Sequence, residues 1–168
     1  MSNHLKDGYS SYNLLFLKRY CEELNKNYKV LDVGTGHYRN LKLFQELGFT
    51  KLYAIDKNVP LSKFNMKVKF ILKDIESGLP YEDKEMDIVL CNYVLMFINP
   101  EKIVFVLEEL LRVCNKFLVI ETYPKYHETK KTEYKEYDFN LIYKYIKSKE
   151  NYEIINMKKC EKLMARRV

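Results

Sequence analysis

Apolar residues along the chain recur with two alternating periods. Short apolar runs predict strands at residues 29–33, 51–55, 67–72, 86–91, 116–120, 152–157 and 162–167. Apolar residues at helical spacing predict helices over residues 11–25, 41–47, 100–114 and 140–149. Strands that alternate with helices predict an α/β domain, a parallel sheet with helices on both faces. The final two strands lack a helix between them, which predicts an antiparallel hairpin at one edge.

The residues at two predicted helix ends agree with this order. Gly48 directly follows one apolar stripe and is expected to stop that helix. Asn99 is expected to cap the next helix, with Pro100 at its first position and Cys114 at the end of its apolar stripe. No internal repeat or low-complexity linker divides the chain, so we expect one domain over residues 1–168.

The composition fits a folded domain with a mildly basic surface. Hydrophobic residues make up 47% of the chain, with 15 Tyr and 9 Phe, which is enough for a core. Because 29 basic residues are mixed with 23 acidic ones, the net charge of +6 permits a nucleic-acid partner without requiring one. The N-terminus is polar and no run of about 18 apolar residues occurs. We therefore expect a cytoplasmic protein without a membrane anchor, as a monomer or homodimer.

The cysteines predict reduced thiols and no metal site. They lie far apart in the chain and form no CxxC pair, the spacing that zinc sites use. Cys91 as a nucleophile is a less favoured alternative, because buried strand cysteines are usually inert. The full set is Cys21, Cys91, Cys114 and Cys160.

The candidate chemistry begins at the turn after the first strand. This turn reads Asp32-Val33-Gly34-Thr35-Gly36, and its glycines let the backbone bend sharply and approach a ligand closely. An acid at position 32 suits a ligand with cationic groups better than one led by a pyrophosphate. A dinucleotide site would place a further glycine where Arg39 stands, so a nicotinamide dehydrogenase is the less favoured interpretation.

Acids after the next two strands have spacings that suit a nucleoside. Asp56 lies twenty residues after Gly36 and can accept hydrogen bonds from both hydroxyls of a ribose, with Lys57 beside it. Asp74 follows the third strand, where it can bond an amino group such as adenine N6, and Ile75 can pack on the ring.

Asn92 and Tyr93 end the fourth strand, where they would face the reacting end of a ligand bound along the strand ends. Neither is flanked by the Pro-Pro-aromatic run that holds an extruded amino-bearing base. Amino methylation of DNA therefore loses support.

Residues 29–120 together resemble the class I S-adenosylmethionine-dependent methyltransferases. The likeness lies in three segments, which are residues 30–36, 78–83 and 86–98. The last of them, followed by Asn99-Pro100-Glu101 and the helix over 107–113, looks like the methyltransferase type 11 group. Residues 36–40 and 94–98 also look like tellurite-resistance-type members.

The resemblance implies a Rossmann-like fold with strand order 3-2-1-4-5-7-6 and an antiparallel seventh strand. It also implies S-adenosylmethionine as the cofactor and S-adenosylhomocysteine as the product. The resemblance also implies which residues bind each part of the cofactor. They are Asp32, Gly34 and Gly36 for methionine, Asp56 for the ribose, Asp74 and Ile75 for adenine, and Asn92 for the methionine end or the transferred methyl. Thr35, Tyr38 and Lys57 complete the expected set.

The chain departs from the family pattern at two places. The third glycine of the family is Tyr38 here, so the phenol must swing clear of the ligand or stack beside it. The Pro-Gly-Gly turn before the fifth strand is replaced by Cys114-Asn115-Lys116, which shortens a loop.

Segments that flank the core are expected to select the methyl acceptor. They are the N-terminal stretch and residues 121–138, a predicted lid in which aromatic residues alternate with lysines and glutamates. A small-molecule acceptor is favoured, with RNA or protein as alternatives, and a non-catalytic cofactor-binding partner protein stays open. Candidate substrate-binding residues are Tyr9, Tyr12, Tyr93, Tyr123 and Tyr126, and candidate bases, none preferred, are His37, Tyr93, Glu121 and His127.

Overall fold

The computed structural model describes residues 8–60, 65–122, 138–158 and 161–168, with only the backbone at residues 157 and 158. The strands are β1 (Lys29–Val33), β2 (Lys51–Asp56), β3 (Val68–Leu72), β4 (Met86–Asn92), β5 (Cys114–Glu121), β6 (Tyr152–Lys158) and β7 (Lys162–Arg167). The helices are α2 (Ser11–Arg19), α3 (Arg39–Glu46), α4 (Ile103–Val113) and α5 (Phe139–Lys147), with short 3-10 helices η1 (Ile75–Ser77), η2 (Leu95–Phe97) and η3 (Pro100–Lys102).

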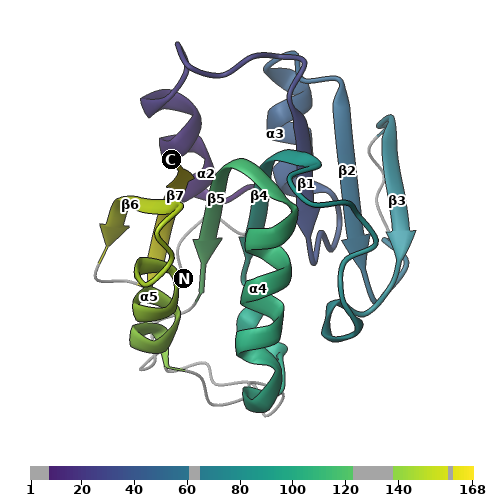
Figure 1. Ribbon diagram of the computed structural model, residues 1–168. Coiled ribbons are helices and arrows are strands. Elements are labelled where there is room, and N and C mark those ends of the chain that lie inside the picture. The colour runs from purple at the N-terminus through teal and green to yellow at the C-terminus, as the bar shows by residue number, and fades with distance from the viewer. Residues whose placement is uncertain (1–7, 61–64, 123–137, 159–160) are drawn as a thin grey trace.

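The strands form one seven-stranded sheet in the order β3-β2-β1-β4-β5-β7-β6. Strands β1 to β5 pair in parallel, and β7 runs antiparallel to both of its neighbours, β5 and β6 (Figure 1). This arrangement confirms the predicted fold class and strand order. The chain reverses direction across the sheet between β1 and β4, the point beside which such sheets bind ligands.

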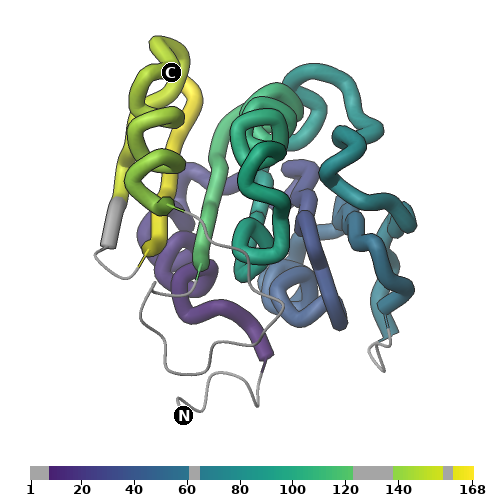
Figure 2. Tube along the Cα trace, turned by 90° about the horizontal axis from the view of Figure 1, so that it is seen from below, coloured from purple at the N-terminus to yellow at the C-terminus, as the bar shows by residue number. Residues whose placement is uncertain are grey.

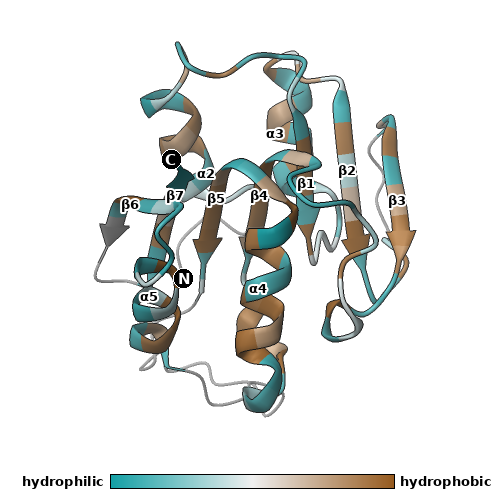
Figure 3. Ribbon diagram, in the orientation of Figure 1, coloured by the Kyte–Doolittle hydropathy of each residue, from teal (hydrophilic) through white to brown (hydrophobic). Residues whose placement is uncertain are grey.

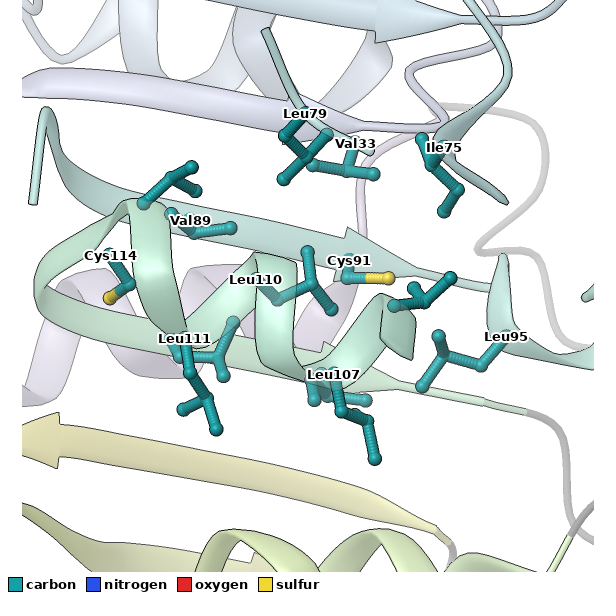
Figure 4. Packing of buried hydrophobic residues seen from close by; sticks show 14 of the residues in the cluster. Val33, Ile75, Leu79, Val89, Cys91, Leu95, Leu107, Leu110, Leu111 and Cys114 are labelled. Carbon is teal, nitrogen blue, oxygen red and sulfur yellow. The ribbon is translucent and has the colours of Figure 1, made fainter. Parts of the chain in front are cut away.

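Helices cover both faces of the sheet, as the view in Figure 2 shows, with α4 and α5 on one face and α2 and α3 on the other. On the first face, Leu107 and Leu110 of α4 pack with Val89 and Cys91 of β4 (Figure 4). The central strands β4 and β5 are buried on both faces and are hydrophobic along most of their length (Figure 3). The packed core therefore fixes the positions of the strand ends, at which the site lies.

The N-terminal helix is shorter than the predicted range of 11–25. Ser10 caps α2 by accepting the N–H groups of Tyr12 and Asn13, and the helix ends at Arg19. Beyond it, Asn25 accepts the backbone N–H of Asn27 through its side chain at 2.8 Å, a local bond that competes with helix. The apolar spacing extended to residue 24 because Leu24, at 7% exposure, is buried without being helical.

The start of the α4 region also differs from the prediction. Pro100 begins the 3-10 helix η3, and α4 starts only at Ile103. The Asn99 side chain does not cap this turn. Its Nδ2 donates to Glu76 Oε2 at 2.7 Å and its backbone N–H to Glu76 Oε1 at 3.0 Å, so Asn99 joins two loops. Gly48, in contrast, follows α3 with φ +89°, as predicted.

The end of α4 explains how the Pro-Gly-Gly turn can be missing. Cys114 was expected to be helical but is the first residue of β5. The Tyr152 hydroxyl donates to the carbonyls of Leu111 and Cys114 at 2.9 and 3.0 Å, and Arg167 donates to the same two carbonyls at 2.8 and 3.0 Å. These donors satisfy carbonyls that a helix end leaves open, so no capping turn is needed.

Candidate functional site

The carboxyl ends of the central strands meet at one edge of the sheet. Asn92 at the end of β4 pairs with Glu121 at the end of β5. Val33 at the end of β1 pairs with Cys91, the residue before Asn92. Asp56 ends β2, one residue past the partner of Val33. The polar strand-end residues predicted from the sequence are therefore brought to a common edge.

The two glycines after β1 have different roles. Both have positive φ, +69° at Gly34 and +56° at Gly36, a conformation that favours glycine. A Cβ at Gly34 would lie 2.2 Å from Cγ2 of Val94, so this glycine allows the chain beyond β4 to pack on the loop. A Cβ at Gly36 would meet no atom of another described residue within 4 Å. The loop therefore presents an open backbone surface at Gly36.

Asp56 lies directly beside this loop. Its Oδ2 accepts the Gly36 N–H at 2.9 Å and its Oδ1 accepts the Asn58 N–H at 2.9 Å. An ionised carboxylate offers about four acceptor positions, so each oxygen can take a further donor. The glycine loop and the candidate ribose acid, separated by twenty residues, thus form one surface.

Asp74 lies on the neighbouring strand end. Leu72, the last residue of β3, pairs with Asp56, and Asp74 follows two residues later. Oδ1 of the exposed Asp74 side chain accepts the Glu76 N–H at 2.9 Å and caps η1. The sequence predicted that the Ile75 side chain contacts a ligand. The side chain is instead 6% exposed and lies in the hydrophobic cluster on the α4 side of the sheet, which also contains Leu107 and Leu110 (Figure 4).

Asp32 is buried beneath the loop, with 1% of its surface exposed. Burial, with a smaller contribution from the charge of Asp56, raises the pKa of Asp32 to about 7, although hydrogen bonds from Thr35 and Asn40 act against the shift. The Thr35 hydroxyl donates to Asp32 Oδ2 at 3.0 Å. Asp32 is thus an acid whose ionisation is poised near neutrality by its surroundings.

Two tyrosines have the left-handed backbone conformation. Tyr38, at the family's third glycine, has φ +62° and precedes α3. Its ring lies edge-on to the Phe70 ring, with the two centroids 6.2 Å apart. It packs against the hydrophobic cluster on the face of the sheet that α2 and α3 cover. Tyr93 has φ +59°, and its backbone N–H donates to the Glu121 carbonyl at 2.6 Å. A bulky residue in this region is strained, a feature that is common at functional sites.

A buried polar network surrounds Asn92 at the end of β4. Asn92 Oδ1 accepts a hydrogen bond from Asn13 Nδ2 at 3.0 Å, and Asn92 Nδ2 donates to Glu121 Oε2 at 3.3 Å. Glu121 also pairs with Lys162 through Oε1 and accepts the Ser10 hydroxyl through Oε2. Because three donors engage this fully buried carboxylate, Glu121 is not free to act as a base.

The remaining predicted residues fall in three groups. Tyr12, a candidate for substrate binding, is instead a core residue with 2% exposure, and its hydroxyl donates to Asn156 Oδ1 at 2.8 Å. His37 and Lys57 are exposed, and Tyr9 is half-buried. The other candidates, Tyr123, Tyr126 and His127, lie outside the described residues, as do most of the predicted lid and Cys160.

Sequence reasoning missed Asn13, which bonds to Asn92, and Lys162, which pairs with Glu121. Asn13 faces inward with Tyr12, Phe16 and Leu17, so an asparagine on the apolar face of a helix was the available signal. Lys162 gave no comparable signal, because its partner lies 41 residues away in the sequence.

Three further observations concern the described residues. No described helix has the length and apolar character that a membrane span requires. In the same part of the chain, no three His, Cys, Asp or Glu side chains gather to hold a metal ion. Burial raises the pKa of the Cys91 thiol, which leaves this cysteine protonated and unreactive.

Comparison with known proteins identifies the family of the chain. The model of the methyltransferase domain family matches residues 31–119, more than half of the chain, and the protein belongs to this family. It is accordingly a methyltransferase that uses S-adenosylmethionine as its methyl donor. No curated protein sequence matches the chain.

Solved structures share the fold at low sequence identity. A methyltransferase from Aquifex aeolicus described as SAM-dependent aligns with a TM-score of 0.70 at 20% identity, covering 100% of this chain and 94% of that one. The 1,6-didemethyltoxoflavin-N1-methyltransferase of Burkholderia thailandensis, with bound 1,6-didemethyltoxoflavin and S-adenosylhomocysteine, aligns at 0.71 and 15%, covering 94% and 77%. Magnesium protoporphyrin IX methyltransferase from Synechocystis PCC 6803, with bound SAH, aligns at 0.68 and 16%, covering 94% and 82%.

Proposed function

We propose that the chain binds S-adenosylmethionine across the carboxyl ends of β1 to β4 and transfers its methyl group to a small molecule. The observation that supports this site is the surface made by Gly36 and Asp56. The backbone at Gly36 is open, and the adjacent carboxylate has acceptor positions left for two hydroxyl groups. These residues fit an adenosyl group, whose ribose carries such a pair of hydroxyls.

Each part of the cofactor then has a candidate partner. Asp56 accepts the ribose hydroxyls, and Asp74 Oδ2 accepts the adenine amino group, since Oδ1 of that side chain already caps η1. Gly36 gives the methionine part close access to the backbone, Gly34 shapes the turn beside it, and Asn92 lies at its far end. Tyr38 does not block this path, because its ring packs on Phe70.

The residues of the chain contribute mainly positioning. When bound, S-adenosylmethionine supplies a methyl group that its sulfonium has already activated for displacement. Fixing donor and acceptor in line can supply roughly 7–11 kcal/mol of the barrier in favourable cases. Where the acceptor must lose a proton, Tyr93 is the candidate base. It directly follows β4, and its backbone has the strained left-handed conformation.

A small-molecule acceptor has support from two similar structures, whose names give 1,6-didemethyltoxoflavin and magnesium protoporphyrin IX as substrates. The mixture of 29 basic with 23 acidic residues along the chain also favours a small molecule over RNA. The cytoplasmic location, the oligomeric state and the tellurite-resistance-type likeness stay predictions.

Isothermal titration with S-adenosylmethionine, S-adenosylhomocysteine and NAD tests the cofactor. We expect binding of the first two and none of NAD; binding of NAD alone would replace the assignment. Incubation of the enzyme and methyl-labelled cofactor with a cell extract tests the acceptor. Label in the low-molecular-weight fraction supports the proposal, and label confined to RNA or protein contradicts it.

A further inference from the structure

The polar network at the end of β4 links four parts of the chain that are distant in sequence. Glu121 of β5 is held between Lys162 of β7 and Ser10, the cap of α2. The Ser10 N–H in turn donates to Asn40 Oδ1 in the first turn of α3 at 2.9 Å. Asn92 lies inside this frame, with 7% exposure.

The frame fixes which way the Asn92 carboxamide faces. Its Nδ2 donates to Glu121 Oε2 at 3.3 Å, so the reverse orientation would place the carbonyl oxygen against a buried carboxylate. Oδ1 therefore faces α2, where Asn13 Nδ2 donates to it at 3.0 Å and Asn40 Nδ2 lies farther off at 3.5 Å. Asn13 thus makes the shorter of the two bonds that hold Asn92 Oδ1.

Asn13 holds Asn92 at the expense of its own hydrogen bonding. Asn13 is 0% exposed, and its Oδ1 has no partner within the described part of the chain. Buried polar atoms are seldom left unpaired, because an unmet acceptor is destabilising. Turning the amide over would not help, since it would bring the two oxygens of Asn13 and Asn92 together. A leucine at position 13 would remove this unpaired atom, while Asn92 Oδ1 would lose the Asn13 bond and keep the one from Asn40 at 3.5 Å. These two effects on the stability of the fold oppose each other, so the net cost of the replacement to the fold is small.

We propose that Asn13 is a positioning residue for the cofactor site. It orients Asn92 through the Asn13 Nδ2 bond, and it couples the N-terminal helix α2 to the end of β4. The inference rests on the proposed function, which places the methionine end of the cofactor at Asn92. Replacing a residue that serves packing alone would show the opposite balance, with a loss of stability and no effect on ligand binding.

Asn13→Leu separates the two roles when thermal unfolding without ligand is measured beside titration with S-adenosylmethionine and S-adenosylhomocysteine. We expect the Tm to stay about the same, while both Kd values rise about tenfold, the size of effect that one lost hydrogen bond has. Asn115→Leu is a matched control, since it removes an amide bond to Asp87 at the opposite edge of the sheet. Its Kd values should equal those of the wild type.

A second variant keeps the test decisive if Asn13→Leu does not fold. Asn13→Asp keeps the shape but offers an oxygen to Asn92 Oδ1 in place of the donor, and it should weaken binding of both ligands in the same way. Wild-type affinity in either folded variant would overturn the inference and leave the proposed function standing. Failure of the wild type to bind S-adenosylmethionine would overturn both.

Discussion

Replacing Asp32 with asparagine should change how the stability of the fold depends on pH. Asp32 is 1% exposed, and burial raises its pKa from 3.8 to about 7. Between these two values the folded protein keeps the proton that the unfolded chain has released. Rising pH therefore favours unfolding over this window, and above pH 7 the contribution of Asp32 stays constant.

The size of the effect follows from the shift. Each pH unit within the window lowers the free energy of unfolding by about 1.4 kcal/mol, so the whole shift corresponds to about 4 kcal/mol. Asparagine has no proton to lose and lacks this dependence. Relative to the wild type, Asp32→Asn should become steadily more stable from pH 4 to pH 7 and hold its advantage at higher pH.

Urea unfolding of both proteins at half-unit steps from pH 4.5 to 8.5 measures this difference. Thr35→Val removes the hydroxyl that donates to Asp32 and works against the shift, so it should move the upper end of the window to higher pH. A cationic ligand near Asp32 would favour its ionised form, so S-adenosylmethionine should release a proton on binding at pH 6. Parallel stability curves for wild type and Asp32→Asn would refute the reasoning.

Other substitutions test the site and the fold separately. Gly34→Ala should destabilise the protein by roughly 1–3 kcal/mol in urea unfolding, because its Cβ would lie 2.2 Å from a neighbouring side chain; wild-type stability would contradict the packing. Gly36→Ala has space for its Cβ, so besides the modest cost of a side chain at positive φ it should weaken S-adenosylmethionine binding in titration, and unchanged affinity would remove Gly36 from the site. Asp56→Ala should raise the Kd for S-adenosylmethionine at least tenfold, the effect of one or more lost hydrogen bonds, and an unaltered Kd would withdraw the ribose assignment. A thiol reagent should label exposed Cys21 in the native protein before buried Cys91, as peptide mapping can check; early labelling of Cys91 would contradict its burial.

Much of the fold could be predicted from the sequence because the signals are local. The apolar runs predicted as strands are β4 and β5, which lie in the buried centre of the sheet. The apolar pattern of the sequence therefore matches the burial of the side chains there. The predicted α2 was too long because buried Leu24 continues the apolar spacing, although the helix has already ended at Arg19. The junction at Cys114 could not be predicted, since its capping donors come from β6 and β7.

The candidate site divides in the same way. Asp56 could be found by its spacing from Gly36, because the single helix that connects β1 to β2 sets the number of residues between the glycine turn and the end of the second strand. The burial of Ile75 and the engagement of Glu121 depend on elements far along the chain, so their local sequence gave no warning. Asn13 was overlooked because a polar residue on an apolar face has no evident partner until the strands are placed.

The structure of the protein crystallised with S-adenosylhomocysteine tests the central claim most directly. We expect both ribose hydroxyls to lie within hydrogen-bonding distance of the Asp56 carboxylate, with the amino-acid part of the ligand beside the Gly36 backbone. An adenosyl group bound elsewhere, with Asp56 still bonded only to its own loop, would contradict it.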